Sequence, residues 1–351
     1  MRRTPRYKVK NMKIPMNLGE HRYDIIVERG VLARADQHLR LDRRVLIVTD
    51  SGVPEHYAKT VADRCAEGVI CTIAEGESSK SLDGFGRLLQ TMLDHGFSRK
   101  DCVVAVGGGV VGDLAGFAAS AYMRGIDFYN IPTTLLSQID SSIGGKTAIN
   151  FGGVKNVVGA FYQPKKVLID PELLKTLPPR QVANGLAEAI KMALTSDKEL
   201  FDVFENQDIE NSIDAIILRS LHIKKSIVEQ DEKESGLRKV LNFGHTIGHG
   251  IESSREEADL YHGECVALGM IPMCADAIRP RVIRVLQRCG LYRTPSYDWD
   301  KITEAAFHDK KADGNAVTVI TVSEIGRFEM KTMHCPDVID RAKNSLEGLK
   351  V

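Results

Sequence analysis

The chain has 351 residues, with 47 basic and 47 acidic side chains, so its formal net charge is zero. A neutral surface creates no field that would draw the protein to nucleic acid or to a membrane. No apolar run approaches the roughly 20 residues of a membrane span, and the basic start has no apolar segment typical of a secretory signal. Seven dispersed cysteines favour free thiols in a reducing cytoplasm. The length favours two domains.

The first half of the chain alternates short β-branched runs with helical patterns. We expect strands at 23–27, 44–49, 69–73, 102–106 and 167–169, with helices at 54–66, 81–95 and 111–122. Continuous apolar strands alternating with helices favour a parallel, doubly wound α/β sheet covered on both faces.

After Pro178 and Pro179 the strand runs nearly vanish and amphipathic helices dominate. We expect helices at 180–195, 209–230, 245–254 and 263–277, and a small hairpin from 316–322 and 327–330. The sequence therefore predicts an α/β domain at 1–177 and an α-helical domain at 178–351.

A glycine-rich segment at 107–112 fits the G-x-G-x-x-G pattern between a predicted strand and a predicted helix. Glycines let a backbone approach a pyrophosphate, which the amides of the helix N-terminus can bind. The match is weak by itself. Asp50, at the end of a strand, is the better ribose candidate. The segment 75–80 could add polar contacts, or it could equally be a solvated turn before the next helix.

A second segment, Gly144-Gly145-Lys146-Thr147, resembles the end of a P-loop. The first glycine position of that motif is Asp140, so the pattern fails and we reject a nucleotide triphosphatase. The neighbourhood is nevertheless rich in cations and polar groups suited to a phosphate-bearing ligand: Arg124, Thr133, Thr134, Ser137, Gln138, Asp140, Lys146, Lys155 and Asn156.

Three histidines fall in a short window of the second half. His245 and His249 are four residues apart, which puts them on one helix face, and His262 follows thirteen residues later. Three imidazoles could bind a divalent metal. A lone i, i+4 pair is more often a surface or core feature.

Several of these motifs occur together in one known family. The segments 107–117, 132–148, 155–156, 185–191, 242–249 and 262–264 resemble the 3-dehydroquinate synthase family of the shikimate pathway, in the right order over roughly residues 23–330. The Asp-Ser-Ser-x-Gly-Gly-Lys-Thr stretch at 140–147 separates this family from related sugar phosphate cyclases that make valiolone or inosose skeletons.

The resemblance implies an N-terminal Rossmann-like NAD domain and an all-α C-terminal metal domain, with the active site between them. It implies a phosphorus–oxygen lyase that uses NAD and Zn²⁺ or Co²⁺ to convert 3-deoxy-D-arabino-heptulosonate 7-phosphate to 3-dehydroquinate and phosphate. A sugar phosphate substrate, a homodimer and a cytoplasmic location are also expected.

The resemblance also assigns residues by position. The implied metal ligands are Glu188, His245 and His262, which moves His249 from the metal to the substrate phosphate. The implied catalytic residues are Asp140, Lys146, Lys191, Asn242 and His249, with Arg124, Asn156, Lys224, Arg238 and Lys311 as further substrate contacts. The implied NAD contacts are Asp50, Glu75, Lys80, Gly108, Gly109, Gly112, Asp113, Thr133, Thr134, Lys146, Lys155 and Thr176.

Three alternatives stay open at this point: a metal-dependent polyol dehydrogenase of the glycerol-dehydrogenase type, a sibling cyclase acting on another sugar phosphate, and a non-catalytic relative. Two segments also depart from the family pattern. Pro272 and Pro280 are expected to interrupt a shortened helical region at 271–291, and residues up to Met12 are expected to form a frayed basic tail.

Overall fold

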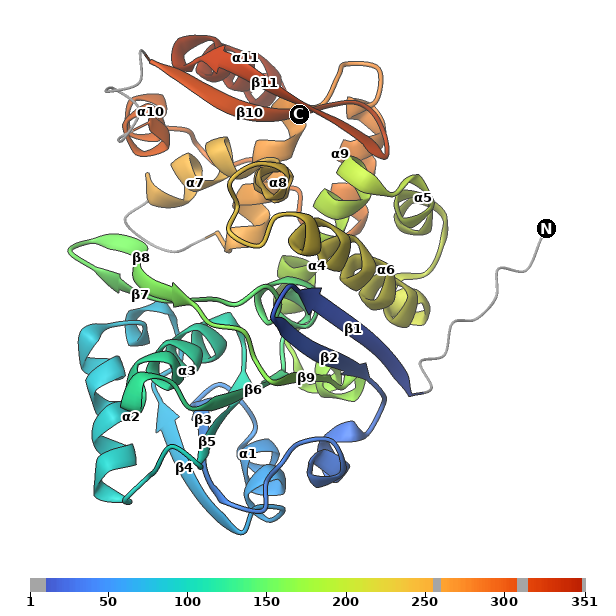
Figure 1. Ribbon diagram of the computed structural model, residues 1–351. Helices are drawn as coiled ribbons and strands as arrows, with labels where there is room; N and C mark the ends of the chain where they lie inside the picture. Colours follow the sequence, from blue (N-terminus) through green and yellow to red (C-terminus); the bar gives the residue numbers. More distant parts are fainter. Residues whose placement is uncertain (1–10, 255–259, 308–314, 349–351) are drawn as a thin grey trace. The chain divides into compact units, whose positions relative to one another are not determined.

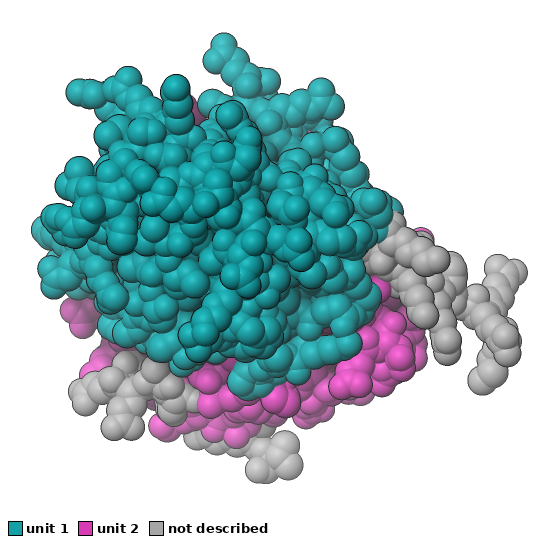
Figure 2. Space-filling model, turned by 90° about the horizontal axis from the view of Figure 1, so that it is seen from below, with its two compact units in different colours: residues 1–178 teal, residues 179–351 magenta. Residues whose placement is uncertain are grey.

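A computed structural model of the protein describes residues 11–254, 260–307 and 315–348. The chain divides into two compact units between Pro178 and Pro179, one residue after the division expected from the sequence. Figure 2 colours the two units separately.

The first unit is built on a seven-stranded sheet in the order β1-β2-β9-β6-β5-β3-β4 (Figure 1). All neighbouring pairs are parallel except β1 and β2. The strands are β1 (Met12–Leu18), β2 (His21–Val27), β3 (Arg44–Asp50), β4 (Glu67–Ile73), β5 (Cys102–Gly107), β6 (Asp127–Pro132) and β9 (Lys166–Ile169), with a separate hairpin of β7 (Lys146–Phe151) and β8 (Val154–Phe161).

Helices cover both faces of this sheet, as the continuous apolar strands predict. On β3, Val45 and Ile47 join a core with the helical turn η1 and helix α1, whereas Leu46 and Val48 join a second core with α2 and α3. Each such aliphatic side chain contributes about 1.5–3 kcal/mol when fully buried. The helical elements are η1 (Val31–Gln37), α1 (Glu55–Ala62), η2 (Glu77–Ser79), α2 (Leu82–Asp94), α3 (Gly109–Ala121), η3 (Tyr122–Arg124), η4 (Ser137–Ser141) and η5 (Pro171–Thr176).

Three features of this unit differ from the expectation. Strand β1 begins at Met12, inside the segment expected to be a frayed tail, because Ile14, Met16 and Leu18 alternate into the core while β1 pairs with β2. Helix α1 ends at Ala62 rather than residue 66, since the Ala66 amide donates to the Leu41 carbonyl instead. The hairpin of β7 and β8 was not expected.

The second unit is mainly helical, with one antiparallel hairpin of β10 and β11 where the sequence predicted it. Its elements are α4 (Pro179–Ser196), α5 (Lys198–Asn206), α6 (Ile209–Gln230), η6 (Leu237–Asn242), α7 (His245–Ser253), α8 (His262–Met273), α9 (Arg279–Arg288), α10 (Trp299–Phe307), β10 (Ala316–Glu324), β11 (Arg327–His334) and α11 (Cys335–Glu347). Helix α9 falls within the helical region expected at 271–291, whereas helices α5, α10 and α11 were not among the predicted elements.

The two prolines of the shortened region act differently from the expectation. Pro272 lies inside the last turn of α8 and does not interrupt it, while Pro280 lies in the first turn of α9, where a missing N–H costs nothing. Helix α8 does end at Met273, earlier than the predicted residue 277. Among the described residues, none of the helices combines the length and apolar character needed to cross a bilayer.

Candidate active site

Helix α4 buries two charged side chains in the second unit. Glu188 and Lys191 are each only 1% exposed, three residues apart on one helix face, and their side chains form an ion pair. Ionised groups are almost never buried without a partner, because desolvation costs several kcal/mol per ion. The interior of this unit therefore contains a built polar site.

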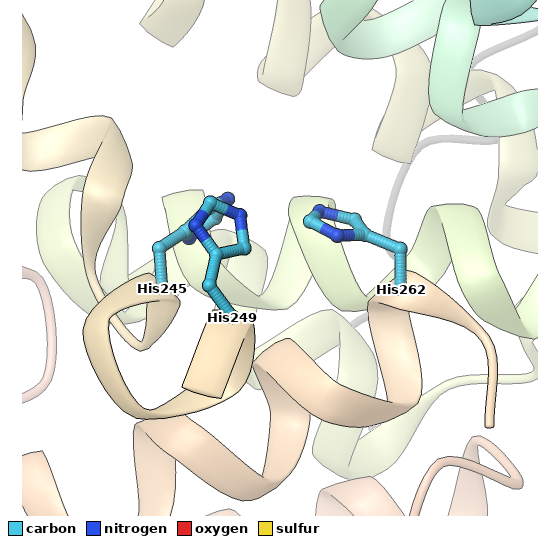
Figure 3. Close-up of side chains that lie close together, drawn as sticks. All are labelled: His245, His249 and His262. Carbon is cyan, nitrogen blue, oxygen red and sulfur yellow. The ribbon is translucent and has the colours of Figure 1, made fainter. Parts of the chain in front are cut away.

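Helices α7 and α8 bring the three histidines to the same place (Figure 3). His245 and His249 lie one turn apart on α7, and His262 is the first residue of α8. The ring centroids are 5.1 Å apart for His245 and His249, 5.4 Å for His245 and His262, and 5.7 Å for His249 and His262. One ring nitrogen of each lies within 4.8 Å of the others.

The Glu188 carboxylate points at two of these imidazoles. Its Oε1 lies 3.7 Å from Nε2 of His245 and 3.6 Å from Nε2 of His262. Both distances are too long for a hydrogen bond. They are close to the roughly 3.4 Å between ligand atoms that surround Zn²⁺ tetrahedrally at about 2.1 Å. The arrangement therefore fits a divalent cation between the three groups.

The charges in this cluster depend on one another. Burial opposes ionisation of Glu188, but Lys191 and the imidazoles outweigh it and hold the pKa of Glu188 well below its ordinary value. Burial, with Lys191 nearby, lowers the pKa of His245 to about 3. Burial also disfavours the charged form of His262, but the neighbouring carboxylates of Glu188 and Glu252 raise its pKa to about 9.

Other predicted substrate residues lie in the same unit. Lys224 on α6 and Arg238 on η6 are both buried. The loop before Arg238 is fixed by Asp231, whose carboxylate accepts backbone N–H bonds from Ser235, Gly236 and Arg238. These bonds lower the pKa of Asp231 to about 2, so it stays ionised at neutral pH.

Asn242, at the end of η6, borders a cavity of about 450 Å³. Its amide donates to Glu234 over 2.8 Å, and the cavity is also lined by Lys239, Thr246 and residues of β10. Lys311, which the resemblance adds to this side of the site, lies outside the described residues.

In the first unit, the predicted glycine segment forms the start of α3. A β-carbon on Gly108 would lie 3.1 Å from Thr134, and one on Gly109 would lie 3.1 Å from the Ser141 hydroxyl. Within the described ranges, the buried Ser141 hydroxyl has no hydrogen-bond partner. A side chain at either glycine would therefore be tightly placed against Thr134 or Ser141, so the glycines keep the start of the helix open. Ser141 was not among the predicted cofactor contacts.

Lys80 joins two predicted groups of residues. It is 3% exposed, and its ammonium donates to Asp113 Oδ2 over 2.8 Å and to the Asn156 side-chain carbonyl. Lys80 and Asp113 were predicted for NAD, whereas Asn156 was predicted for the substrate phosphate. Burial raises the pKa of Asp113 to about 6, although Lys80 opposes the shift.

Several predicted NAD contacts make local bonds. Asp50 accepts N–H bonds from Gly52 and Val53 just after β3, and a β-carbon on Gly52 would meet the Glu75 carboxylate at 2.6 Å. Thr176 shares a 2.9 Å hydrogen bond with Tyr57. The other predicted positions of this unit are Arg124 at the exposed end of η3, Thr133 directly after β6, Asp140 in η4, Lys146 at the start of β7 and Lys155 in β8.

Comparison with known proteins decides the family. The 3-dehydroquinate synthase N-terminal family model matches residues 70–184, and the C-terminal model of the same family matches 185–312. The chain is 41% identical over 339 residues to the 3-dehydroquinate synthase of Streptococcus thermophilus, covering 90% of this chain and 95% of the relative. The chain belongs to the 3-dehydroquinate synthase family.

A second relative gives the same result over a similar span. The 3-dehydroquinate synthase of Streptococcus sanguinis is 42% identical over 341 residues, with 90% of this chain and 95% of the relative covered. The predicted resemblance is therefore confirmed across most of the chain.

Solved structures of related cyclases share the fold. A 2-deoxy-scyllo-inosose synthase complexed with carbaglucose-6-phosphate, NAD⁺ and Co²⁺ superimposes with a TM-score of 0.87 at 26% identity, covering 95% of this chain and 100% of that one. A 2-epi-5-epi-valiolone synthase from Streptomyces hygroscopicus with NAD⁺ and Zn²⁺ bound gives 0.84 at 29% identity, covering 97% and 99%. The predicted fold class is confirmed.

A probable glycerol dehydrogenase from Sinorhizobium meliloti is more distant. Its TM-score is 0.59 at 17% identity, with 92% of this chain and 96% of that chain covered. This likeness concerns the fold alone, so it gives no support to the polyol dehydrogenase alternative.

Proposed function

We propose that this chain is a lyase that converts 3-deoxy-D-arabino-heptulosonate 7-phosphate to 3-dehydroquinate and phosphate. Its membership of the 3-dehydroquinate synthase family supports this activity. The observation that carries the proposal is the convergence of Glu188, His245 and His262 at ligand spacing in the second unit. The sibling cyclases are less similar, at 26% and 29% identity.

The metal site fits Zn²⁺ or Co²⁺, which occupy the related cyclases. Glu188, His245 and His262 would hold the ion, since one carboxylate and two imidazoles leave positions open for a substrate. When bound, the metal supplies a Lewis acid that polarises a substrate hydroxyl. Lys191 compensates the Glu188 carboxylate, and this contact fixes the carboxylate on α4 with one oxygen facing the imidazoles.

The first unit fits NAD. Gly108 and Gly109 leave room at the start of α3 for a pyrophosphate, and Asp50 and Glu75 lie at the carboxyl ends of β3 and β4, where nucleotides bind in open α/β sheets. When bound, NAD⁺ accepts a hydride from the substrate and later returns it, so the reaction has no net redox change. Lys80 holds Asp113 and Asn156 beside the same helix.

The remaining residues recognise an anionic sugar. Lys191, Lys224 and Arg238 are buried cations of the second unit, and their positive charge suits the substrate carboxylate. Asp140 and Asn242 would bind hydroxyl groups. The phosphate contacts would come from Arg124, Lys146, Asn156, His249 and Lys311. Together, these contacts would orient the substrate for oxidation, phosphate elimination, reduction and aldol closure of the ring.

The deciding experiment measures phosphate release from the heptulosonate phosphate with NAD⁺ and Zn²⁺ or Co²⁺. We expect one 3-dehydroquinate for each phosphate, without accumulation of NADH. His245→Ala should lower the rate at least about thousandfold, because a ligand to the metal is lost. His222→Ala, which removes an exposed imidazole on α6, is the matched control.

Other outcomes would identify the alternatives. Net NADH production from polyols would support a dehydrogenase, and cyclisation of another sugar phosphate would support a sibling cyclase. Full activity of His245→Ala would overturn the metal assignment.

We also propose that the protein works as a homodimer in the cytoplasm. None of the seven cysteines, all of which lie in the described ranges, forms a disulfide, which is typical of a reducing compartment. Light scattering after size-exclusion chromatography tests the dimer, and fractionation of the source cells tests the location.

A further inference from the structure

A carboxylate that belongs to none of the predicted sets lies directly behind the metal site. Oε2 of Glu252 is 3.1 Å from Nδ1 of His262, on the opposite side of the ring from Nε2, which faces Glu188. The side chains of His262 and Glu252 are 31% and 21% exposed, so both are largely shielded from water. A hydrogen bond in this position fixes which nitrogen of the ring carries the proton.

The position of Glu252 follows from its place on α7. It lies seven residues, or two turns, after His245 and therefore on the same helix face. One helix thus supplies the metal ligand His245 and, two turns later, a carboxylate directed at the ligand of the neighbouring helix.

Close packing of α7 against α8 makes this contact possible. A β-carbon on Gly269 would lie 2.0 Å from the Gly244 carbonyl oxygen, and one on Gly248 would lie 3.0 Å from the Cys265 carbonyl oxygen. The two backbones therefore touch at glycines. The helices run antiparallel, so Gly244 is near Gly269, Gly248 is near Cys265, and Glu252 is near His262. Backbone contact of this kind leaves little freedom for the Glu252–His262 pair to separate.

We propose that Glu252 is a positioning residue for the metal ligand His262, an inference that rests on the metal site of the proposed function. Glu252 accepts the Nδ1–H bond and keeps the Nε2 lone pair directed at the ion. Metal-binding histidines commonly donate their other N–H to such a partner, whose loss costs about 10–100-fold in metal affinity or activity. His245 is oriented differently, since its Nδ1 lies 3.2 Å from the Phe243 carbonyl oxygen.

The test compares Glu252→Gln, Glu252→Ala and the control Glu304→Gln. Glutamine keeps the size and an acceptor oxygen, so the fold should be retained while the negative charge is lost. Glu304 is an exposed carboxylate on α10, a helix that packs on α7 through the contact of Ile302 with Gly250, and its change to glutamine removes the same charge.

Two readouts do not depend on catalysis. Zn²⁺ affinity, measured by competition with a chelator, should fall about tenfold in Glu252→Gln and up to about a hundredfold in Glu252→Ala. The visible absorption bands of bound Co²⁺ should shift in both variants, because the His262 ring is no longer held in one orientation. Glu304→Gln should match the wild-type protein in both measurements, and the metal-free thermal midpoints verify that each variant is folded.

The outcomes separate the inference from the proposed function. Wild-type affinity and an unchanged Co²⁺ spectrum in both Glu252 variants would overturn the positioning role alone, provided that His245→Ala still abolishes binding. Metal binding that is absent from the wild-type protein, or unaffected by His245→Ala, would overturn the metal site and the inference together.

Discussion

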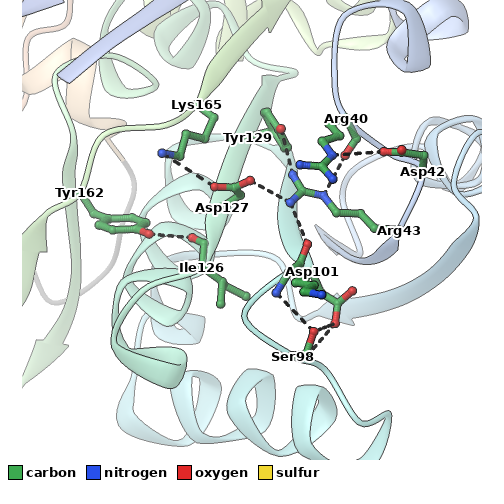
Figure 4. A network of polar contacts seen from close by, with 11 residues as sticks. Arg40, Asp42, Arg43, Ser98, Asp101, Ile126, Asp127, Tyr129, Tyr162 and Lys165 are labelled. Carbon is green, nitrogen blue, oxygen red and sulfur yellow. Dashed lines mark hydrogen bonds and ion pairs between the residues drawn. The ribbon is translucent and has the colours of Figure 1, made fainter.

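Two charged networks of this protein differ in whether their donors and acceptors form hydrogen bonds with one another. At the amino ends of β3, β5 and β6, Arg43 donates to the carbonyl oxygens of Arg40 and Lys100, to Asp127 and to the Tyr129 hydroxyl, over 2.8 to 3.0 Å (Figure 4). Donors and acceptors match within that network. In the histidine cluster, Glu188 Oε1 and the Nε2 atoms of two imidazoles converge at 3.6 to 3.7 Å, too far apart for hydrogen bonds.

The difference separates two uses of buried charge. A network whose donors all reach acceptors holds strands together and requires nothing from solution. A cluster of carboxylate and imidazole atoms at this spacing, without hydrogen bonds between them, fits a cation. The distances between donors and acceptors therefore distinguish a structural network from a candidate binding site.

The largest expected effect comes from Glu188→Gln. Loss of the anionic ligand should lower phosphate release at least about thousandfold, equivalent to about 4 kcal/mol of activation free energy. The metal-free unfolding free energy should also fall, by about 3 kcal/mol, because the buried Lys191 loses its anionic partner. Rate assays and urea unfolding of the metal-free protein measure the two quantities.

The control for that variant is Glu210→Gln, an exposed carboxylate at the start of α6. If Glu188→Gln destabilised the metal-free protein but kept its activity, the histidine cluster would be a structural network like that of Arg43.

Arg43→Met should lower stability without lowering activity. The Arg43 side chain is only 8% exposed, and its removal leaves Asp127 without its closest cation, so the unfolding free energy should fall by about 3 kcal/mol. The kcat/KM of the folded fraction should stay at the wild-type value. Arg40→Met, which removes an exposed cation paired with Asp42, should shift stability by less than about 0.5 kcal/mol. A selective loss of kcat/KM in Arg43→Met would contradict the comparison.

The smallest expected effect concerns the Lys80–Asp113 pair. Its donor and acceptor match, as in the Arg43 network, but both residues were predicted to contact NAD. Burial raises the pKa of Asp113 to about 6 against the pull of Lys80, with smaller shifts from Glu77 (upward) and Lys146 (downward). Between about pH 4 and pH 6 the folded chain then holds a proton that the unfolded chain has lost. Its unfolding free energy should therefore fall by about 2 kcal/mol as pH rises through this window.

Asp113→Asn has no carboxyl group to titrate at this position. As pH rises through the same window, the unfolding free energy of the variant should therefore rise by the same amount relative to that of the wild-type protein. Urea unfolding at several pH values measures the difference. Asp83→Asn, at an exposed position in the first turn of α2, should instead follow the wild-type curve. Parallel curves for Asp113→Asn and the wild-type protein would show that Asp113 ionises normally in the folded chain.

The fold could be predicted where local pattern and tertiary role agree. Strands β3 and β5 are continuous apolar runs because both faces of a parallel sheet are buried. Strand β1 was missed although its buried residues alternate as in a half-buried strand, because it directly follows the basic start that was read as a tail. Within the helical region expected at 271–291, the start of α9 was missed because Pro280 looks like an interruption until its place in the first turn is known.

The site could be predicted only in part. Pattern alone indicated three histidines, whereas the resemblance supplied Glu188, which lies 57 residues before His245 and meets it only in the folded unit. Glu252 carries a usable signal, because its spacing from His245 puts both on one face of α7. The contact of Asn156 with Lys80 has no such signal, since it depends on how β8 lies against the rest of its unit.

The glycine contact between α7 and α8 has a consequence for protein engineering. The distance between His245 and His262 is set by contact between the two backbones and not by the volume of side chains. These contacts lie at Gly244, Gly248 and Gly269. We therefore expect that neighbouring apolar residues can be exchanged without moving the two histidines, whereas a single methyl group at Gly269 would push them apart. A designer who grafts the proposed metal site onto another helical scaffold would need to transfer the three glycines together with the histidines.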